Sequence, residues 1–109
     1  MLLGLVASVV MALQVTSGGE ASEWCSAEGD RMTFIVYGVR AESYTVRADA
    51  PDEIQGPSEW VLVGGEWRQT DLSPRYRRIA PLVVFREGEM VYSYSVMGER
   101  RERVWLPCS

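Results

Sequence analysis

The residues best suited to recognition chemistry lie in a short stretch between two prolines. This stretch, SPRYRRIAP, runs from Ser73 to Pro81 and places three arginines beside one tyrosine. Guanidinium groups form paired hydrogen bonds with carboxylates and phosphates, and a neighbouring aromatic ring adds rigid contact area. We therefore predict a binding site for an anionic group, made by Ser73, Arg75, Tyr76, Arg77 and Arg78. The alternative is a solvated loop whose arginines pair with nearby acidic side chains.

Residues for catalysis are scarce. The sequence contains no histidine, and its eleven basic residues are all arginine. Histidine-dependent nucleophiles and lysine-based dyads or Schiff bases therefore have no candidates. Zinc and copper would find no imidazole, and the two cysteines are better explained as a disulfide. A Ca²⁺ site within Asp49–Glu53 is the alternative to a solvated acidic loop there. We predict no enzymatic activity, no cofactor and no metal site.

An apolar, uncharged segment opens the chain at Leu2–Leu13. It is shorter than the roughly 20 residues that a membrane-spanning helix needs. Small polar residues follow it, so we predict a signal peptide over residues 1–21 with cleavage after Ala21. An uncleaved N-terminal anchor is the alternative. Cleavage would leave a periplasmic or secreted domain over residues 22–109, with no stable membrane insertion.

The two cysteines, Cys25 and Cys108, stand at opposite ends of that predicted mature chain. Export to an oxidising compartment predicts that they form one disulfide, which closes nearly the whole domain into a loop. Two free thiols in a reducing cytosol are the alternative. A domain of this size has a small core, and a disulfide would supply much of its stability.

Charge is unevenly distributed along the chain. Residues 22–66 contain nine acidic side chains and three arginines, whereas residues 67–109 contain five acidic side chains and eight arginines. The formal net charge of the whole chain is −4. Because nucleic-acid-binding domains are usually clearly basic, we predict no nucleic-acid partner.

Two turn signals predict hairpins with defined registers. Gly64-Gly65 and Glu87-Gly88 are each flanked by alternating apolar residues. The predicted cross-strand pairs are Leu62–Trp67, Trp60–Gln69, Phe85–Met90 and Val83–Tyr92. The second hairpin thus gathers its apolar side chains on one sheet face, and such a face must be buried.

The N-terminal half of the predicted domain contains two further strands. The segment Arg31–Arg40 is β-branched and aromatic, and a turn at Ala41-Glu42 leads into a strand over 44–49. In the second strand we expect Tyr44, Val46 and Ala48 to face inward. The segment 50–58 contains two prolines and a glycine, and it is predicted to be a loop.

Together these segments predict an all-β domain, an antiparallel barrel or sandwich of seven to eight strands closed by the terminal disulfide. The four tryptophans are expected to lie in its core, with an exposed binding platform as the alternative. The last strand has two possible registers. A two-residue turn at Gly98-Glu99 would place Arg101, Arg103 and Trp105 on the apolar face, and a three-residue turn would place Val104 and Leu106 there. Because burying two arginines is costly, the longer turn is favoured.

These features resemble the periplasmic inhibitors of C-type lysozyme, which are small disulfide-closed β-barrels. The resemblance rests on an aromatic residue before Cys25, on Ser73-Pro74-Arg75-Tyr76, on Val84-Phe85-Arg86-Glu87-Gly88 and on Cys108. The family has a Ser-Gly-x-x-Tyr loop and a Lys-Gly turn. Here one residue is missing between Ser73 and Tyr76, Pro74 replaces the glycine, and Glu87 replaces the lysine.

The sequence thus leads to two functional hypotheses. The first is an exported, non-catalytic binding protein with a protein partner, which the resemblance suggests is a lysozyme-like hydrolase that it inhibits. The second is a structural or accessory protein of the bacterial cell envelope, which docks on a larger assembly through its apolar sheet face.

Overall fold

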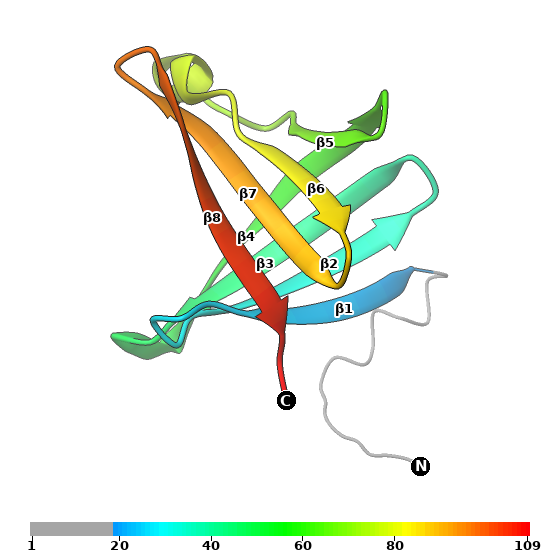
Figure 1. Cartoon of the computed structure of the whole chain (residues 1–109), viewed down its shortest axis with the longest axis vertical. Coiled ribbons are helices and arrows are strands. Elements are labelled where there is room, and N and C mark those ends of the chain that lie inside the picture. The colour runs from blue at the N-terminus through cyan, green and yellow to red at the C-terminus, as the bar shows by residue number, and fades with distance from the viewer. Residues whose placement is uncertain (1–18) are drawn as a thin grey trace.

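The computed structural model describes residues 19–109, which form one closed antiparallel β-barrel (Figure 1). Each strand pairs with the next one along the chain, and the last pairs with the first. The elements are β1 (Glu20–Cys25), β2 (Arg31–Tyr37), β3 (Arg40–Arg47), β4 (Ala50–Val63), β5 (Glu66–Gln69), the 3₁₀ helix η1 (Pro74–Ile79), β6 (Leu82–Arg86), β7 (Glu89–Val96) and β8 (Glu99–Pro107). The predicted all-β class is confirmed, and of the two architectures expected the structure is the barrel.

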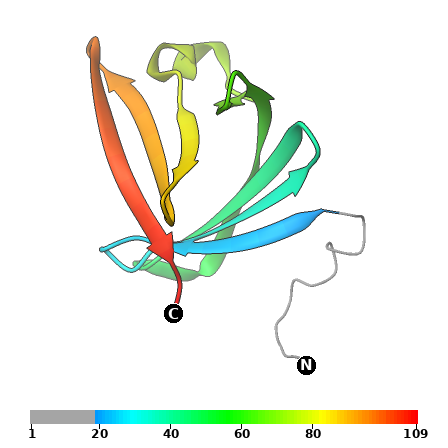
Figure 2. The ribbon, with the colours of Figure 1, turned by 45° about the vertical axis from the view of Figure 1, so that its right-hand side comes forward.

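The chain-order topology assigns the connections to two ends of the barrel. One end, called here the η1 end, carries the β1–β2, β3–β4 and β7–β8 turns together with η1, which joins β5 to β6. The opposite end carries the β2–β3, β4–β5 and β6–β7 turns. In the turned view, η1 and the tip of the β7–β8 hairpin lie at the same end of the molecule, with η1 next to the start of β6 (Figure 2).

Both predicted hairpin registers are confirmed. Across the Gly64-Gly65 turn, Leu62 pairs with Trp67 and Trp60 with Gln69. Across the Glu87-Gly88 turn, Phe85 pairs with Met90 and Val83 with Tyr92. Local turn chemistry is sufficient here because a two-residue turn fixes the register of the strands that it joins.

The expected turn between β2 and β3 is wrong by three residues. The turn lies at Gly38-Val39, since Tyr37 pairs with Arg40. Gly38 adopts a φ of 67°, which glycine reaches without steric cost. The shift reverses the facing of β3: Ala41 and Ser43 are buried opposite Val36 and Phe34. Tyr44 and Val46, expected to face inward, therefore lie on the outer face.

The expected loop over 50–58 is also wrong, because these residues belong to the long strand β4. Its pairing with β3 is interrupted by two register shifts, between Ser43 and Thr45 and between Thr45 and Arg47. Prolines are tolerated at such irregularities, where the ladder does not use every backbone N–H. Gly56 lies at one shift, and a Cβ atom there would come within 2.7 Å of the Ser43 carbonyl oxygen.

The favoured register of the last strand is wrong as well. The turn has two residues and lies at Met97-Gly98, one residue before the expected Gly98-Glu99, so Val96 pairs with Glu99 and Met90 with Trp105. Trp105 is therefore inside the barrel, whereas Val104 and Leu106 are exposed. The expected cost of burying arginines is avoided because Arg101 remains exposed and Arg103 is paired with acidic side chains.

Aromatic side chains dominate the core inside the barrel. Phe34 is fully buried, and its ring lies 5.6 Å from that of Trp67 and 5.2 Å from that of Phe85. The buried Trp60 indole donates a hydrogen bond of 2.9 Å to the Ser43 hydroxyl. Three of the four tryptophans are core residues, and Trp24 packs against them partly buried, as expected.

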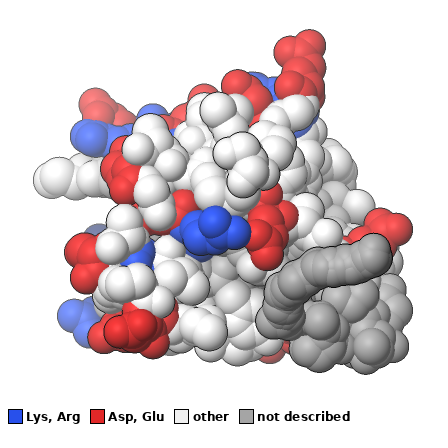
Figure 3. All heavy atoms as spheres, turned by 90° about the horizontal axis from the view of Figure 1, so that it is seen from below, with Lys and Arg blue, Asp and Glu red and all other residues white. Residues whose placement is uncertain are grey.

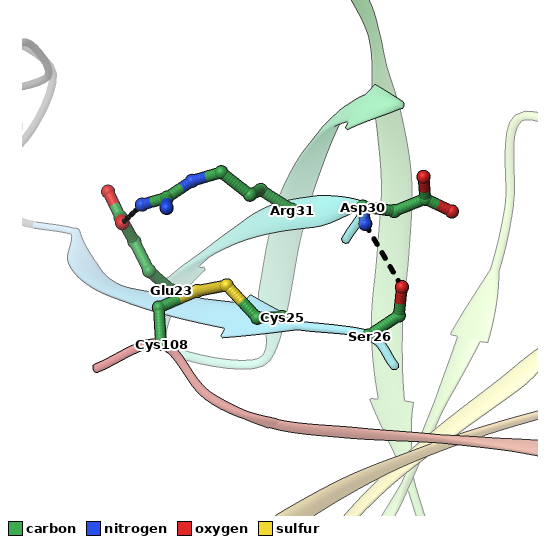
Figure 4. Close-up of a disulfide and its surroundings, with 6 residues drawn as sticks. All are labelled: Glu23, Cys25, Ser26, Asp30, Arg31 and Cys108. Atoms are coloured by element: carbon green, nitrogen blue, oxygen red, sulfur yellow. Dashed lines mark hydrogen bonds and ion pairs between the residues drawn. A yellow bond between two sulfur atoms is a disulfide. The ribbon is translucent and has the colours of Figure 1, made fainter. Parts of the chain in front are cut away.

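The predicted disulfide joins Cys25, at the end of β1, to Cys108, directly after β8 (Figure 4). The β1–β8 seam has only two paired positions, Trp24 with Pro107 and Cys25 with Leu106. The disulfide therefore reinforces one of the two shortest strand pairings of the barrel, the other being β5–β6. An ion pair of 2.6 Å between Arg31 and Glu23 lies beside it.

The predicted signal peptide lies outside the described residues except for its last three. Glu20 and Ala21 pair with Val36 and Ile35, so the predicted cleavage site is inside β1. Cleavage there would leave Ser22–Cys25 paired with β2. Over residues 19–109, no helix has the length and apolar character needed to cross a membrane.

Candidate functional site

The predicted arginine segment forms a short helix that projects from the η1 end. Pro74 occupies the first turn of η1, where its missing N–H breaks no hydrogen bond. The Tyr76 N–H donates to the Ser73 carbonyl at 2.9 Å, and the helix ends at Ile79, with Ala80 as its C-cap at a φ of 40°. No residue of η1 is buried. The segment between Pro74 and Pro81 is thus a compact helical turn whose polar side chains are exposed.

The three arginines of η1 have no ion-pair partner among residues 19–109, whereas six other arginines of the barrel are paired. The Arg75 guanidinium carbon lies 5.6 Å from the centre of the Tyr76 ring, and that tyrosine is half exposed. The structure therefore shows none of the intramolecular ion pairs that the solvated-loop alternative expected. The guanidinium groups of Arg75, Arg77 and Arg78 are available to an external anion.

A fourth arginine, Arg100, fixes the position of η1 on the barrel. Its Nη1 donates to the carbonyl oxygen of Ala80 at 3.1 Å and to the Ser95 hydroxyl at 2.9 Å. Its Nη2 donates to the Ser93 hydroxyl at 2.8 Å. Arg100 therefore connects the C-terminal end of η1 to β7, and it was not included in the site predicted from the sequence.

A shallow hollow of about 310 Å³ lies between η1 and strands β5 and β6. Its lining combines two arginines, polar side chains and a few apolar ones: Arg68, Gln69, Thr70, Leu72, Arg77, Ala80 and Leu82. Arg77 thus borders a recess instead of extending from a flat surface. A carboxylate that enters this recess would meet the guanidinium group of Arg77 from η1, whereas that of Arg68 on β5 is already paired with Glu66.

A second charged cluster lies at the η1 end but is closed on itself. The Arg103 Nη2 donates to Asp30 at 2.6 Å and to Glu28 at 2.7 Å, and the guanidinium lies 4.7 Å from the centre of the Trp105 ring. The Ala48 N–H and Arg103 lower the pKa of the Asp30 carboxyl. The Arg103 hydrogen bond likewise lowers the pKa of Glu28. Because its single guanidinium is already bound to two carboxylates, this cluster leaves no free cationic group for an external anion.

Other chemistry has little support in the described residues. Between residues 19 and 109 there is no group of three or more side chains arranged to hold a metal ion, Asp49–Glu53 included. The face seen in Figure 3 shows more acidic than basic side chains, mixed with uncharged surface. The unpaired arginines of η1 thus contrast with a chain that is acidic overall.

Comparison with known proteins gives no family assignment. No protein-family model, no curated protein and no solved structure matches this chain.

The structure brings all five predicted site residues together, because they are consecutive or nearly so on η1 and its N-cap. The prediction missed Arg100, whose guanidinium binds the C-terminal end of η1. The sequence signal for it was the Arg-rich, Gly-containing segment MGERRER.

Proposed function

We propose that this chain is an exported, non-catalytic binding protein that uses η1 to engage an acidic site on another protein. The observation that carries the proposal is the set of three arginines without ion-pair partners on a projecting, proline-initiated helix. Charged anchors of this kind gain most when they enter a cleft that excludes water.

Export is supported by the disulfide. A Cys25–Cys108 bridge persists in oxidising compartments and is rare in the cytosol, which favours a periplasmic or secreted location. We expect the signal peptide to be removed and the barrel to work without remaining inserted in a membrane.

The partner class proposed here is a lysozyme-like hydrolase, which the chain would inhibit. A lysozyme cleft contains two catalytic carboxylic groups, one of them ionised at neutral pH. An arginine of η1 could pair with the ionised group while Tyr76 packs against the cleft wall. The closed barrel and its terminal disulfide agree in outline with the inhibitor family that the sequence resembles.

The test is an inhibition assay of the purified, oxidised protein against C-type lysozyme. The wild type should inhibit at micromolar concentration, and the Arg75→Ala/Tyr76→Ala double variant should bind at least about tenfold more weakly. Arg47→Ala is the control, because Arg47 is similarly exposed but paired with Asp49 and lies outside η1. Absence of inhibition by the wild type removes the lysozyme proposal. Equal inhibition by the double variant removes η1 as the binding element.

The accessory-protein hypothesis relied on an apolar sheet face that docks on a larger assembly. The centre of that face, Val83 and Met90, lines the barrel and is fully buried, whereas Phe85 at its edge is 36% exposed. The outer surface of β8 still exposes Val104 and Leu106. Light scattering after size-exclusion chromatography separates the two hypotheses, because only the accessory protein needs a stable assembly.

A further inference from the structure

We propose that the tip of the β7–β8 hairpin is the second half of the binding surface, so that Met97 and η1 contact the same acidic protein partner. This inference rests on the proposed function and adds an apolar contact to its charged one. The partner site that fits is a group of carboxylates bordered by an apolar recess.

The first argument is the exposure and conformation of Met97. Its side chain is 99% exposed, and its φ is 51° in a turn whose second residue, Gly98, has a φ of 87°. Turns of this kind need positive φ at both central positions and favour glycine or asparagine there. Gly64 occupies the equivalent position of the β4–β5 turn with a φ of 59°. Glu87 has the same conformation in the β6–β7 turn, so what distinguishes Met97 is an apolar residue that is 99% exposed at a position that favours glycine or asparagine.

The second argument is that η1 and the tip are held together. Arg100 lies three residues after Met97 in the sequence. Its guanidinium donates to the carbonyl oxygen of Ala80, the C-cap residue of η1. The same guanidinium binds the Ser95 hydroxyl on β7, two residues before Met97. Figures 1 and 2 show η1 and the tip at the same end in both views. Because their relative position is already fixed, a partner that contacts both loses little conformational freedom.

The third argument is the chemistry of the combined surface. Arginine, tyrosine and methionine are the residue types that protein interfaces enrich. The unpaired arginines of η1 require an acidic partner surface by charge complementarity. A methionine side chain is flexible and polarisable, so it fills irregular apolar recesses next to such charges.

The test uses two substitutions that are conformationally matched. Met97→Gly removes the side chain at the tip and relieves its positive φ. Glu87→Gly is the control, because Glu87 has a φ of 47° and precedes Gly88 in the same kind of turn at the opposite end of the barrel. Both variants should be at least as stable as the wild type in thermal denaturation. Lysozyme inhibition should weaken about fivefold or more for Met97→Gly and stay within about twofold for Glu87→Gly.

A second measurement separates this inference from the choice of lysozyme. The ¹⁵N-labelled protein is titrated with the acidic, apolar peptide acetyl-Glu-Leu-Glu-Phe-Glu-amide and followed by amide chemical shifts. We expect the amides of Met97 and Gly98 to shift together with those of residues 75–78, and Met97→Gly to weaken binding. Shifts confined to η1, or no shifts at all, would overturn the inference. If the peptide shifts both elements but lysozyme is not inhibited, the lysozyme proposal fails and the joint surface stands. If lysozyme is inhibited equally by the wild type and Met97→Gly, the joint surface fails.

Discussion

Arg103 lies on the inner face of β8, where its guanidinium joins the wall of the barrel to the β1–β2 turn. It contacts Asp30, Glu28 and the Ser26 hydroxyl, and its other side lies over the ring of Trp105. Burial alone would lower the pKa of this guanidinium, but its hydrogen bonds to Glu28 and Asp30 outweigh that effect and raise it. Arg103 is therefore charged at every relevant pH, and the carboxylates are the groups that titrate.

This cluster predicts a loss of stability on acidification. The pKa values of Asp30 and Glu28 in the folded chain lie below their ordinary values of 3.8 and 4.5. In that range the unfolded chain binds more protons than the folded one, so stability falls as the pH falls. Thermal denaturation should show the midpoint decreasing below about pH 4.5 for the wild type. The midpoint of Arg103→Gln should decrease less steeply with pH. In that variant the hydrogen bond from the Ala48 N–H is the main remaining cause of the lowered Asp30 pKa.

The control for that measurement is Arg101→Gln. Arg101 is exposed and its only ion pair in the described residues, with Glu99 at 3.7 Å, lies along the surface of β8. Its substitution should leave the pH dependence of the wild type in place. Parallel pH profiles for wild type and Arg103→Gln would show that the cluster does not contribute.

At the scale of elements, β4 depends on one glycine. Gly56 has a φ of 124°, and a Cβ atom there would lie 2.7 Å from the Ser43 carbonyl oxygen. Both features exclude an ordinary side chain, because the conformation is unfavourable for L-residues and the contact is with backbone. Gly64 also has a positive φ, of 59°, but a Cβ atom there would contact nothing within 4 Å.

Gly56→Ala should therefore lower the free energy of unfolding by more than about 2 kcal/mol, and Gly64→Ala by about 1 kcal/mol. Urea denaturation of the two variants beside the wild type measures both losses. Equal losses would mean that the β3–β4 contact at Ser43 relaxes without cost, and that only the backbone conformation matters.

At the scale of the molecule, the disulfide closes a loop of 83 residues in sequence and joins the ends of the strands that seal the barrel. Replacing both cysteines by serine should lower the free energy of unfolding by about 4 kcal/mol, because a loop this long strongly restricts the unfolded chain. Denaturant titration of the oxidised wild type and the Cys25→Ser/Cys108→Ser variant measures this difference.

Alkylation provides the matching chemical test. The oxidised chain should take up no iodoacetamide without reductant, since the structure has no free cysteine. After reduction it should take up two equivalents, one at Cys25 and one at Cys108.

In the denaturant titration, equal free energies of unfolding for the oxidised wild type and the serine variant would contradict this prediction. They would show that the β1–β8 pairing, and not the disulfide, holds the barrel closed.

Features that depend on neighbouring residues follow from the amino-acid sequence alone. The turn residues at Gly64-Gly65 and Glu87-Gly88 were sufficient to predict two hairpin registers, because a two-residue turn allows its flanking strands only one register. Cysteine placement was sufficient for the disulfide. The five predicted site residues stay together because they lie on one short segment, whatever the rest of the chain does.

Features that depend on residues distant in sequence became visible in the folded barrel. Segment 50–58 becomes strand because Gly56 fits against the backbone of Ser43. Arg103 can face inward because Glu28 and Asp30, more than seventy residues away, reach its guanidinium. Met97 joins the η1 surface because Arg100 is bound to the end of that helix. The free energy of each of these contacts depends on a partner that is distant in sequence and that no local pattern identifies. Predictions from local propensity alone were therefore wrong or incomplete for these features.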